Sequence, residues 1–320
     1  MGVLRPRRAQ AGGLGRHPRH RLGRPVRLSH LGQVPQAPGA RERRAGGVPV
    51  TGALWAALAA GAAAAASARW NWWRPKAPGV PILMYHMVGD PAPGSVHPKL
   101  WVRVADFRWQ LRHLLDSGRT PLFFSELQAV LEGKAPLPPR PVLVTFDDGT
   151  ADVFEKAFPV LRELGVKANV FLVCGAVGKH TAWEDPSRHP WQRLMDWEQV
   201  RALRDSGLVE FGSHSMTHPD LAALPEEEVF WQAAESKSRL EARLERPVPA
   251  FAYPYGSGAR AEAVRAQVRK AGYRFDCGIR QGICPWPWDP EGAAMPRLLV
   301  RGDDFRLDFR LNLSRGRARL

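Results

Sequence analysis

Two adjacent aspartates follow a short apolar stretch near the middle of the chain. Residues 142–146 are mostly apolar and β-branched, come after a proline-rich segment, and lead into Asp147, Asp148 and Gly149. This pattern is typical of a buried strand in an α/β protein. Because the chain turns where a strand ends, both carboxylates can reach one cleft, one of them on a metal ion and the other free. A plain Asp-Asp-Gly turn is the alternative interpretation.

Two histidines four residues apart form a second candidate cluster. His214 and His218 lie in the polar segment 213–218. If that turn is helical they share one face, so both imidazoles can bind one ion. Solvated loop histidines are the alternative. Together with one aspartate, two histidines leave an open position on a tetrahedral metal ion, and that coordination is typical of a catalytic site.

A third candidate is the turn Tyr253-Pro254-Tyr255-Gly256, which follows an apolar stretch. A turn of this composition can direct a backbone N–H into a cleft, where the N–H would stabilise a developing oxyanion. A turn that only ends the strand is the alternative interpretation.

Strands and helices alternate from residue 80 onward, and they must position these groups. Apolar runs and breakers predict strands at 80–86, 142–146, 168–173, 208–211, 249–253, 273–278 and 297–300. Helical spacing predicts helices at 107–115, 124–131, 152–164, 197–206, 226–245 and 260–271. This alternation predicts an α/β fold with a mostly parallel sheet, and about seven strands favour a barrel over an open sheet.

The first residues differ in composition from the rest of the chain. Residues 1–45 contain 11 Arg and one Glu, which account for +10 of the formal net charge of +15. We expect this basic leader to be disordered, or to be an over-extended gene start that is not translated. The remaining chain is nearly ordinary in charge and has no basic stripe interleaved with aromatics, so we predict no nucleic-acid binding.

Residues 46–68 carry no charge, follow three arginines at 41–44 and end in Ala66-Ser67-Ala68. These features indicate a cleavable signal peptide or an N-terminal membrane anchor. Alanine is only weakly apolar, which favours export over firm anchoring. We therefore expect a protein at the extracytoplasmic face of the membrane, in the periplasm or in the medium.

The remaining boundaries follow from composition. We assign 69–79 to a linker, 80–302 to one folded domain and 303–320 to a basic tail, and we expect a monomer. Three cysteines fit a chain that does not depend on disulfides, although Cys277 and Cys284 could pair outside the cytoplasm.

The order of the motifs resembles a known family. Thr-Phe-Asp-Asp-Gly at 145–149, His-Ser-x-x-His at 214–218 and Pro-Tyr-Gly at 254–256 are similar to the polysaccharide deacetylases of carbohydrate esterase family four, the nodulation-protein-like deacetylases. The likeness covers about 80–302 and implies a deformed (β/α) barrel that removes acetyl groups from N-acetylglucosamine with a metal ion. Leu-Met-Tyr-His at 83–86 and Tyr-Pro-Tyr-Gly at 253–256 resemble the branch acting on poly-β-1,6-N-acetylglucosamine, an exported exopolysaccharide.

The resemblance also implies roles for individual residues. Asp148, His214 and His218 would bind the ion, with zinc as the first expectation and cobalt or nickel as alternatives. Asp147 would be the general base, and the backbone N–H of Tyr255 would bind the oxyanion. A metal-bound water molecule needs a carboxylate beside it to take its proton, which agrees with this division of roles.

Two departures from the family are visible. Many members have an arginine at the place of Tyr253 and a Leu-x-His near the end, but here no histidine follows His218. We take His86 as the candidate general acid. Arg297 could replace the missing arginine or simply pair with a carboxylate, and Tyr253, Pro254 and Arg297 are assigned to substrate binding.

Other functions stay open at this point. The same fold could act on peptidoglycan, a chitin-type polymer or acetylated xylan. Without its acid it could also be an inactive carbohydrate-binding protein, although a binding protein has no need of a base at Asp147.

Overall fold

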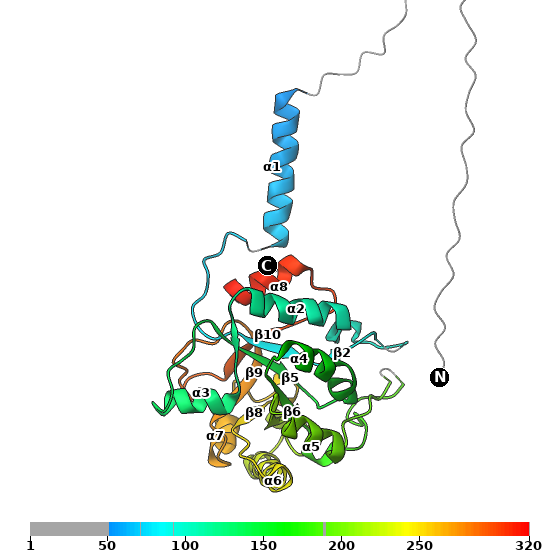
Figure 1. Ribbon diagram of the computed structural model, residues 1–320, viewed down its shortest axis with the longest axis vertical. Coiled ribbons are helices and arrows are strands. Elements are labelled where there is room, and N and C mark those ends of the chain that lie inside the picture. Colours follow the sequence, from blue (N-terminus) through cyan, green and yellow to red (C-terminus); the bar gives the residue numbers. More distant parts are fainter. Residues whose placement is uncertain (1–50, 71, 92, 188–189, 320) are drawn as a thin grey trace, which may run out of the picture. The chain divides into compact units, whose positions relative to one another are not determined.

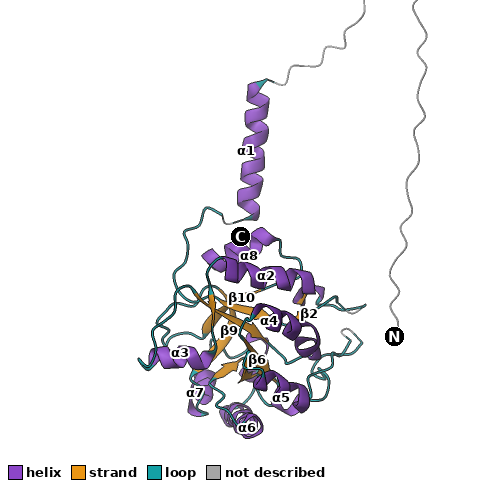
Figure 2. Ribbon diagram, viewed as in Figure 1, coloured by secondary structure: helices purple, strands orange, loops and turns teal. Residues whose placement is uncertain are grey.

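Seven parallel strands close into a barrel in the described part of the chain. The computed structural model describes residues 51–320 except 71, 92, 188–189 and 320, so the basic leader at 1–45 lies outside it. The strands are β1 (Ile82–Tyr85), β5 (Pro141–Phe146), β6 (Ala168–Leu172), β7 (Val209–Ser213), β8 (Ala250–Ala252), β9 (Phe275–Gln281) and β10 (Met295–Leu299). Their order is β1-β10-β9-β8-β7-β6-β5, and β1 also pairs with β5 (Figures 1 and 2). The predicted barrel of about seven parallel strands is confirmed.

Three short strands lie outside this ring. β4 (Thr120–Pro121) pairs with the first two residues of β5. β2 (Met87–Val88) and β3 (Trp101–Val102) form a separate parallel pair directly after β1. The β2–β3 pair matters for the site because β2 begins at Met87, the residue that follows His86.

Strand alternation decides which side chains enter the barrel. Along β5, Val142, Val144 and Phe146 join the apolar cluster that includes the helices, whereas Leu143 joins a second cluster with residues of β1, β8, β9 and β10. Neighbouring side chains of a strand point to opposite faces. Residues 143, 145 and 147 therefore face the barrel interior, and Asp147 enters it at the carboxyl end of the strand.

The longer helices cover the outside of the barrel (Figure 1). They are α2 (Val104–Asp116), α3 (Phe124–Leu131), α4 (Phe158–Leu164), α5 (Trp197–Asp205), α6 (Glu226–Leu244) and α7 (Glu262–Lys270). The helix predicted at 152–164 is broken into α4 and a π turn at Val153–Ala157. Pro159 lacks an N–H and stands in the first turn of α4, so the ordinary helical ladder cannot run through it.

Residues 303–319 are folded, which differs from the basic tail expected at 303–320. It contains α8 (Arg306–Arg315), in which Phe309, Leu311 and Leu313 are buried. Asp308 has no exposed surface and accepts hydrogen bonds from Arg69, Trp70 and Arg319. Arginines interrupt the apolar residues of this segment, and their charge concealed a helix that is held by buried contacts.

Helix α1 (Gly52–Arg69) falls within the segment expected to direct export, and none of its residues is buried. In the part of the chain that the structure describes, no helix combines the length and the apolar character that crossing a membrane requires. Cys174, Cys277 and Cys284 are buried free thiols, so Cys277 and Cys284 are not paired.

Candidate active site

Three predicted metal ligands meet at the carboxyl ends of β5 and β7. Nε2 of His214 lies 3.5 Å from Oδ1 of Asp148, and Nε2 of His218 lies 3.4 Å from the same oxygen. One ligand atom from each residue lies within 4.8 Å of the others. The two histidines are buried and Asp148 is partly exposed. This spacing suits a single ion held by two imidazoles and one carboxylate, with one side open to solvent.

The hydrogen bond made by Nδ1 of His214 supports a role for its Nε2 as a metal ligand. Its Nδ1 lies 2.7 Å from the carbonyl oxygen of Ala252, and because a carbonyl can only accept, Nδ1 carries the proton and Nε2 presents a lone pair toward Asp148. Burial lowers the pKa of His214 to about 4, against the opposing effect of Asp147. The imidazole is therefore neutral at pH 7, as a metal ligand must be.

Aromatic rings enclose His218. The ring of Trp183 stacks on it with centroids 4.4 Å apart, and the ring of Tyr255 meets it edge-on at 4.6 Å. Its backbone N–H donates to the Ser215 hydroxyl, 2.9 Å away. The Nδ1 atom of His218 is buried and has no hydrogen-bond partner in the described residues. The rings fix the orientation of this imidazole and limit the access of water to one side of the site.

The backbone brings these residues together by left-handed turns. Of the six non-glycine residues with positive φ in the described chain, four belong to the site: Asp148 (69°), Ser215 (69°), His218 (64°) and Tyr255 (56°). Such conformations cost free energy in non-glycine residues and gather at functional sites. The segment 214–218 is not helical, so the prediction that the histidines converge is confirmed, but the helical turn on which it was based is wrong.

Asp147 is held by an arginine from another strand. Nη1 and Nη2 of Arg297, on β10, each donate to one carboxylate oxygen of Asp147 at 2.7 Å. Arg297 has no exposed surface, Asp147 is 2% exposed, and Nε of Arg297 donates to the carbonyl of Gly278 at 2.9 Å. Arg297 thus pairs with the carboxylate that is the predicted base, and its use in place of the missing arginine stays a prediction.

Both aspartates are ionised at neutral pH. Burial alone would raise the pKa of Asp147, but the Arg297 guanidinium, and His214 once it is protonated at low pH, outweigh burial, and the pKa lies below its ordinary value. Burial also opposes ionisation of Asp148, and His218 and His214 overcome it, so the pKa of Asp148 is far below its usual range. One carboxylate can thus bind a cation while its neighbour accepts a proton.

His86 lies beside the aspartates. It follows β1, whose register places Tyr85 opposite Phe146, and the N–H of Asp147 donates to the carbonyl of Tyr85 at 3.0 Å. A positive charge on His86 lowers the pKa of both aspartates. Its side chain is partly exposed and its Nδ1 is buried without a partner among the described residues. The predicted acid is therefore at the site, and its role stays a prediction.

The residues assigned to substrate binding are placed differently. Tyr255 is 52% exposed, whereas Tyr253, Pro254 and Arg297 are buried. The Tyr253 hydroxyl donates to Asp276 at 2.8 Å, inside the protein. As placed, Tyr253, Pro254 and Arg297 cannot touch a polymer directly, and this part of the prediction needs correction. They support the walls of the site instead.

The comparisons with known proteins agree with this geometry. Residues 134–275 match the family model described as polysaccharide deacetylase. The chain carries a polysaccharide deacetylase domain. The matched segment contains Asp147, Asp148, His214, His218 and Tyr255. His86 and Arg297 lie outside the matched segment of the deacetylase domain, although the barrel brings both to the same aspartates.

Relatives of the deacetylase domain are distant in sequence. A Bacillus subtilis protein assigned by name to the polysaccharide deacetylases is 28% identical over 63% of this chain. The poly-β-1,6-N-acetyl-D-glucosamine N-deacetylase of Staphylococcus epidermidis is 28% identical over 54% of it. The chain spans 65% and 58% of their lengths. The structure of IcaB from Ammonifex degensii is 25% identical, with 75% of this chain and 97% of that one covered and a TM-score of 0.61.

Asp152, which no sequence pattern singled out, helps hold the site of the deacetylase domain together. The carboxylate of Asp152 is buried and accepts from the N–H of Val88 at 2.6 Å. Burial raises the pKa of Asp152 to about 6. The bond ties the segment after His86 to the chain that follows the aspartates. Nothing in the sequence around Asp152 signals this contact, because its partner is a backbone N–H more than 60 residues away.

Proposed function

We propose that this chain is a metal-dependent hydrolase that removes N-acetyl groups from N-acetylglucosamine residues of a cell-envelope or extracellular polysaccharide. The observation that carries the proposal is the pairing of two neighbouring aspartates with different partners. Asp148 faces two imidazoles, and Asp147 is fixed by Arg297. This arrangement separates a ligand from a base within one site, as hydrolysis of an amide requires.

The ligand set fits zinc, with cobalt and nickel as alternatives, because imidazole and carboxylate suit these ions. When bound, such an ion activates water and polarises the amide carbonyl. Asp148, His214 and His218 would hold it. Asp147 would take the proton from the attacking water, since both of its oxygens keep lone pairs beyond those bound by Arg297.

The remaining residues would serve the other atoms of the amide. The N–H of Tyr255, on the exposed turn at 254–256, would donate to the carbonyl oxygen as it gains negative charge. His86 would donate a proton to the leaving nitrogen. The C–N bond breaks, water supplies the new oxygen, and the products are acetate and a free amine.

Poly-β-1,6-N-acetylglucosamine is the proposed polymer. The name of the Staphylococcus epidermidis relative specifies this substrate, as does that of an Escherichia coli relative that is 24% identical over 72% of this chain. An ionised Asp147 speaks against the alternative of an inactive carbohydrate-binding protein. We also propose that the protein is exported and monomeric, which N-terminal sequencing of the native protein and sedimentation of the purified protein would test.

Metal removal tests the proposed function directly. We expect chelated protein to release no acetate from N-acetylated β-1,6-glucosamine oligomers and to recover activity with zinc. His214→Gln should bind zinc more weakly, with a proportional loss of activity. Chitin oligomers, peptidoglycan and acetylated xylan assayed in parallel identify the polymer. Full activity of the chelated protein, or release of acetate from none of these polymers while zinc still binds, would exclude the proposed function.

A further inference from the structure

A cavity lined by arginines adjoins the turn that carries Tyr255. It has a volume of about 480 Å³, and its lining includes Gly256, Arg260, Ile279, Arg280, Gln281 and Arg317. Gly256 packs directly on Ile279, because a Cβ at Gly256 would lie 2.3 Å from the Ile279 side chain. The cavity therefore begins where the exposed turn of the active site ends.

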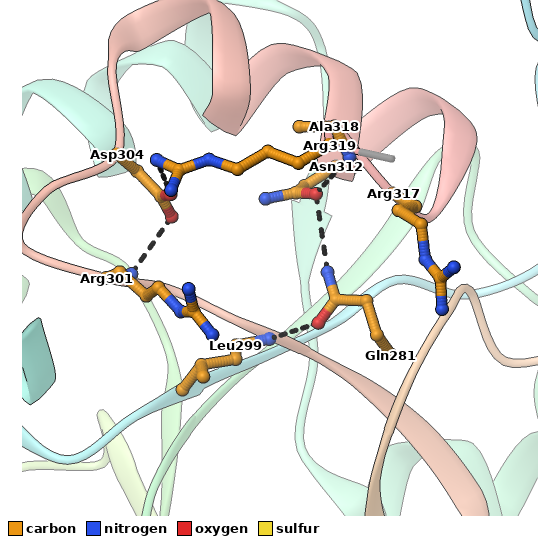
Figure 3. A pocket seen from close by; sticks show the side chains of 8 residues that line it. All are labelled: Gln281, Leu299, Arg301, Asp304, Asn312, Arg317, Ala318 and Arg319. Atoms are coloured by element: carbon orange, nitrogen blue, oxygen red, sulfur yellow. Dashed lines mark hydrogen bonds and ion pairs between the residues drawn. The ribbon is translucent and has the colours of Figure 1, made fainter. Parts of the chain in front are cut away.

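A second cavity continues from the first. It has a volume of about 280 Å³ and lies between the ends of β9 and β10 and the C-terminal part of α8 (Figure 3). Gln281 and Arg317 line both cavities, so the two form one depression. We call it the basic groove and define it by its five arginines, Arg260, Arg280, Arg301, Arg317 and Arg319.

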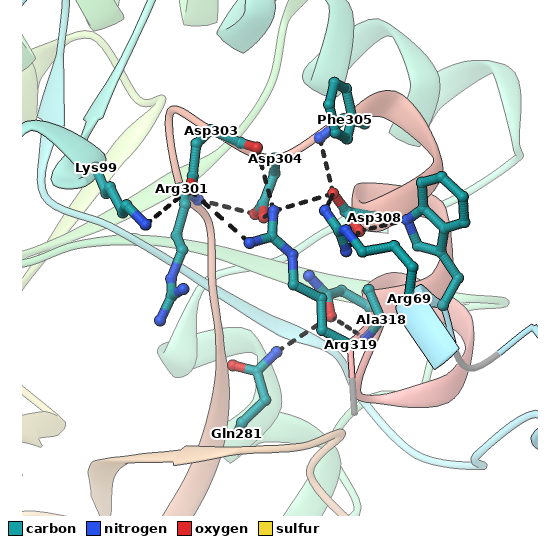
Figure 4. Close-up of polar contacts among 12 residues, drawn as sticks. Arg69, Lys99, Gln281, Arg301, Asp303, Asp304, Phe305, Asp308, Ala318 and Arg319 are labelled. Atoms are coloured by element: carbon teal, nitrogen blue, oxygen red, sulfur yellow. Dashed lines mark hydrogen bonds and ion pairs between the residues drawn. The ribbon is translucent and has the colours of Figure 1, made fainter. Parts of the chain in front are cut away.

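The positive charge of the basic groove is mostly uncompensated. Asp304 is the single acidic residue in the lining of the two cavities, and it already accepts from Arg319 Nη2 and from the backbone N–H of Arg301, both within 3.1 Å (Figure 4). Within the described residues, the guanidinium groups of Arg260, Arg280, Arg301 and Arg317 make no hydrogen bond or ion pair. Four cationic side chains thus face one groove without a protein anion.

An amide nitrogen in the groove is fixed as a hydrogen-bond donor. Oδ1 of Asn312 accepts from Nε2 of Gln281 at 3.3 Å and from the N–H of Ala318 at 2.7 Å. Gln281 is fixed in turn, because its Oε1 accepts from the N–H of Leu299 at 3.1 Å. The Asn312 nitrogen is thereby turned away from Gln281 toward the space beside Arg301 (Figure 3). Arginines and an oriented amide N–H together offer donors only, which selects an anionic ligand.

The groove meets the active site at its first cavity, because Gly256, which lines that cavity, directly follows Tyr255. The second cavity extends away from the active site along α8, whose Ser314 and Leu313 carbonyls accept from Ala77 and Arg119, ahead of β1 and β4. A neutral polymer crossing the groove would leave four arginines without an anionic partner. A polymer with a carboxylate or phosphate group would be bound by bidentate contacts.

We propose that the basic groove binds a carboxylate or phosphate group carried by the polysaccharide, on a sugar close to the one whose acetamido group is hydrolysed. This inference rests on the function proposed above and narrows its substrate to a poly-β-1,6-N-acetylglucosamine that carries anionic substituents, since the unsubstituted polymer is neutral. The groove would hold the chain from one side of Tyr255 and so determine which acetamido group enters the site.

Two oligomers of the same size and different charge test the proposal. Both are fully N-acetylated β-1,6-glucosamine hexamers, the first with neutral O-carbamoylmethyl groups and the second with O-carboxymethyl groups. We expect the zinc-loaded wild-type protein to bind and hydrolyse the carboxymethylated hexamer at least about tenfold better, as expected for one or two hydrogen bonds to a charged group. High salt should reduce the preference by screening.

Matched double variants locate the effect. Arg280→Gln/Arg317→Gln removes two charges from the groove, and Arg246→Gln/Arg274→Gln removes two from exposed arginines before β8 and β9, at the opposite end of the barrel. The first should abolish the preference for the charged hexamer and the second should retain it. Equal binding of both hexamers by the wild type, or an unchanged preference in the groove variant, would overturn the proposal.

Direct binding separates this proposal from the enzymatic one. Titration calorimetry with both hexamers reports on the groove even when no acetate is released, so the two proposals fail independently. Vesicles with and without anionic phospholipid provide the third arm. If the groove variant loses binding to anionic vesicles while its preference for the charged hexamer is unchanged, the groove serves a lipid phosphate and the polymer proposal is overturned.

Discussion

The Arg297–Asp147 pair and the Arg265–Asp276 pair are built alike. In each pair one guanidinium donates to both oxygens of one carboxylate, at 2.7 Å and 2.7 Å in the first and at 2.7 Å and 3.1 Å in the second. None of the four residues is more than 3% exposed. Arg297 and Asp276 belong to adjacent strands of the barrel. The ion pairs themselves therefore do not distinguish the two regions.

The groups around the two ion pairs distinguish the two regions. Asp276 also accepts from the Tyr253 hydroxyl, and Arg265 donates to the carbonyls of Pro290 and Gly292, so protein groups surround this pair. Asp147 instead lies next to His214 and Asp148, where a ligand would bind. The same ion pair is a structural support when protein surrounds it, and part of a reactive site when one side is left for a ligand.

Replacing the carboxylate of each pair should reveal the largest difference between the two regions. Asp147→Asn keeps the shape and removes the base, so we expect kcat to fall by about 10² to 10⁴ with zinc affinity unchanged. Asp276→Asn should change kcat by only a few-fold, although both variants leave a buried arginine unpaired and should lower stability. Acetate release and zinc titration on both variants measure these effects. Comparable kcat losses in both variants would show that Asp147 has no chemical role of its own.

Replacing each arginine should cost similar stability but different chemistry. Arg297→Gln and Arg265→Gln each leave a buried carboxylate unpaired, so we expect each to lower the free energy of unfolding by about 3–5 kcal/mol. Because Arg297 lowers the pKa of Asp147, its removal should also move the acid limb of the kcat/KM profile to higher pH. Denaturant unfolding and pH-rate profiles measure the two effects. An unshifted profile in Arg297→Gln would contradict the role assigned to this arginine.

His214 adds a pH dependence next to the first pair. Its folded-state pKa of about 4 lies below the ordinary value near 6.5, so the unfolded chain binds the proton first as pH falls. Neutral His214 therefore contributes about 3 kcal/mol to the free energy of unfolding above about pH 6.5, and this contribution is lost as pH falls toward 4. Chelated protein unfolded in denaturant at several pH values provides the measurement. His214→Gln should flatten this part of the curve, while Asp276→Asn should retain it.

The smallest effect is expected from Tyr253→Phe. It removes one hydrogen bond to Asp276 and should lower the free energy of unfolding by about 2 kcal/mol. Zinc affinity and the pH-rate profile should stay as in the wild type, because Tyr253 belongs to the structural pair. A shifted profile would show that the two regions are coupled.

The barrel and the three candidate metal ligands could both be predicted from the sequence. Seven apolar runs gave seven strands, since a parallel strand buried on both faces is apolar throughout. The motifs at 145–149 and 214–218 contain their ligands within a few residues. Local patterns of this kind are visible in one sequence because the residues that must meet are close along the chain or lie at the end of a recognisable strand.

Other features depend on distant partners and could not be predicted. Arg297 reaches Asp147 across 150 residues, and its spacing from the motif carries no signal. The burial of Tyr253 depends on Asp276, and the left-handed turn at Ser215 follows no propensity of serine. The helix at 306–315 was missed because its charged residues conceal the side that packs on the domain.

Asp308 closes a very long loop. Arg69 and Trp70 on one side and Arg319 on the other donate to this single carboxylate (Figure 4), and Arg69 lies 239 residues before it in the chain. Closing a flexible loop of that length costs about 5 kcal/mol of chain entropy. The contact therefore becomes favourable only after the folded barrel has brought residues 69 and 308 close together, so it should form last in folding. Hydrogen exchange at the Trp70 indole N–H should then report the first step of unfolding.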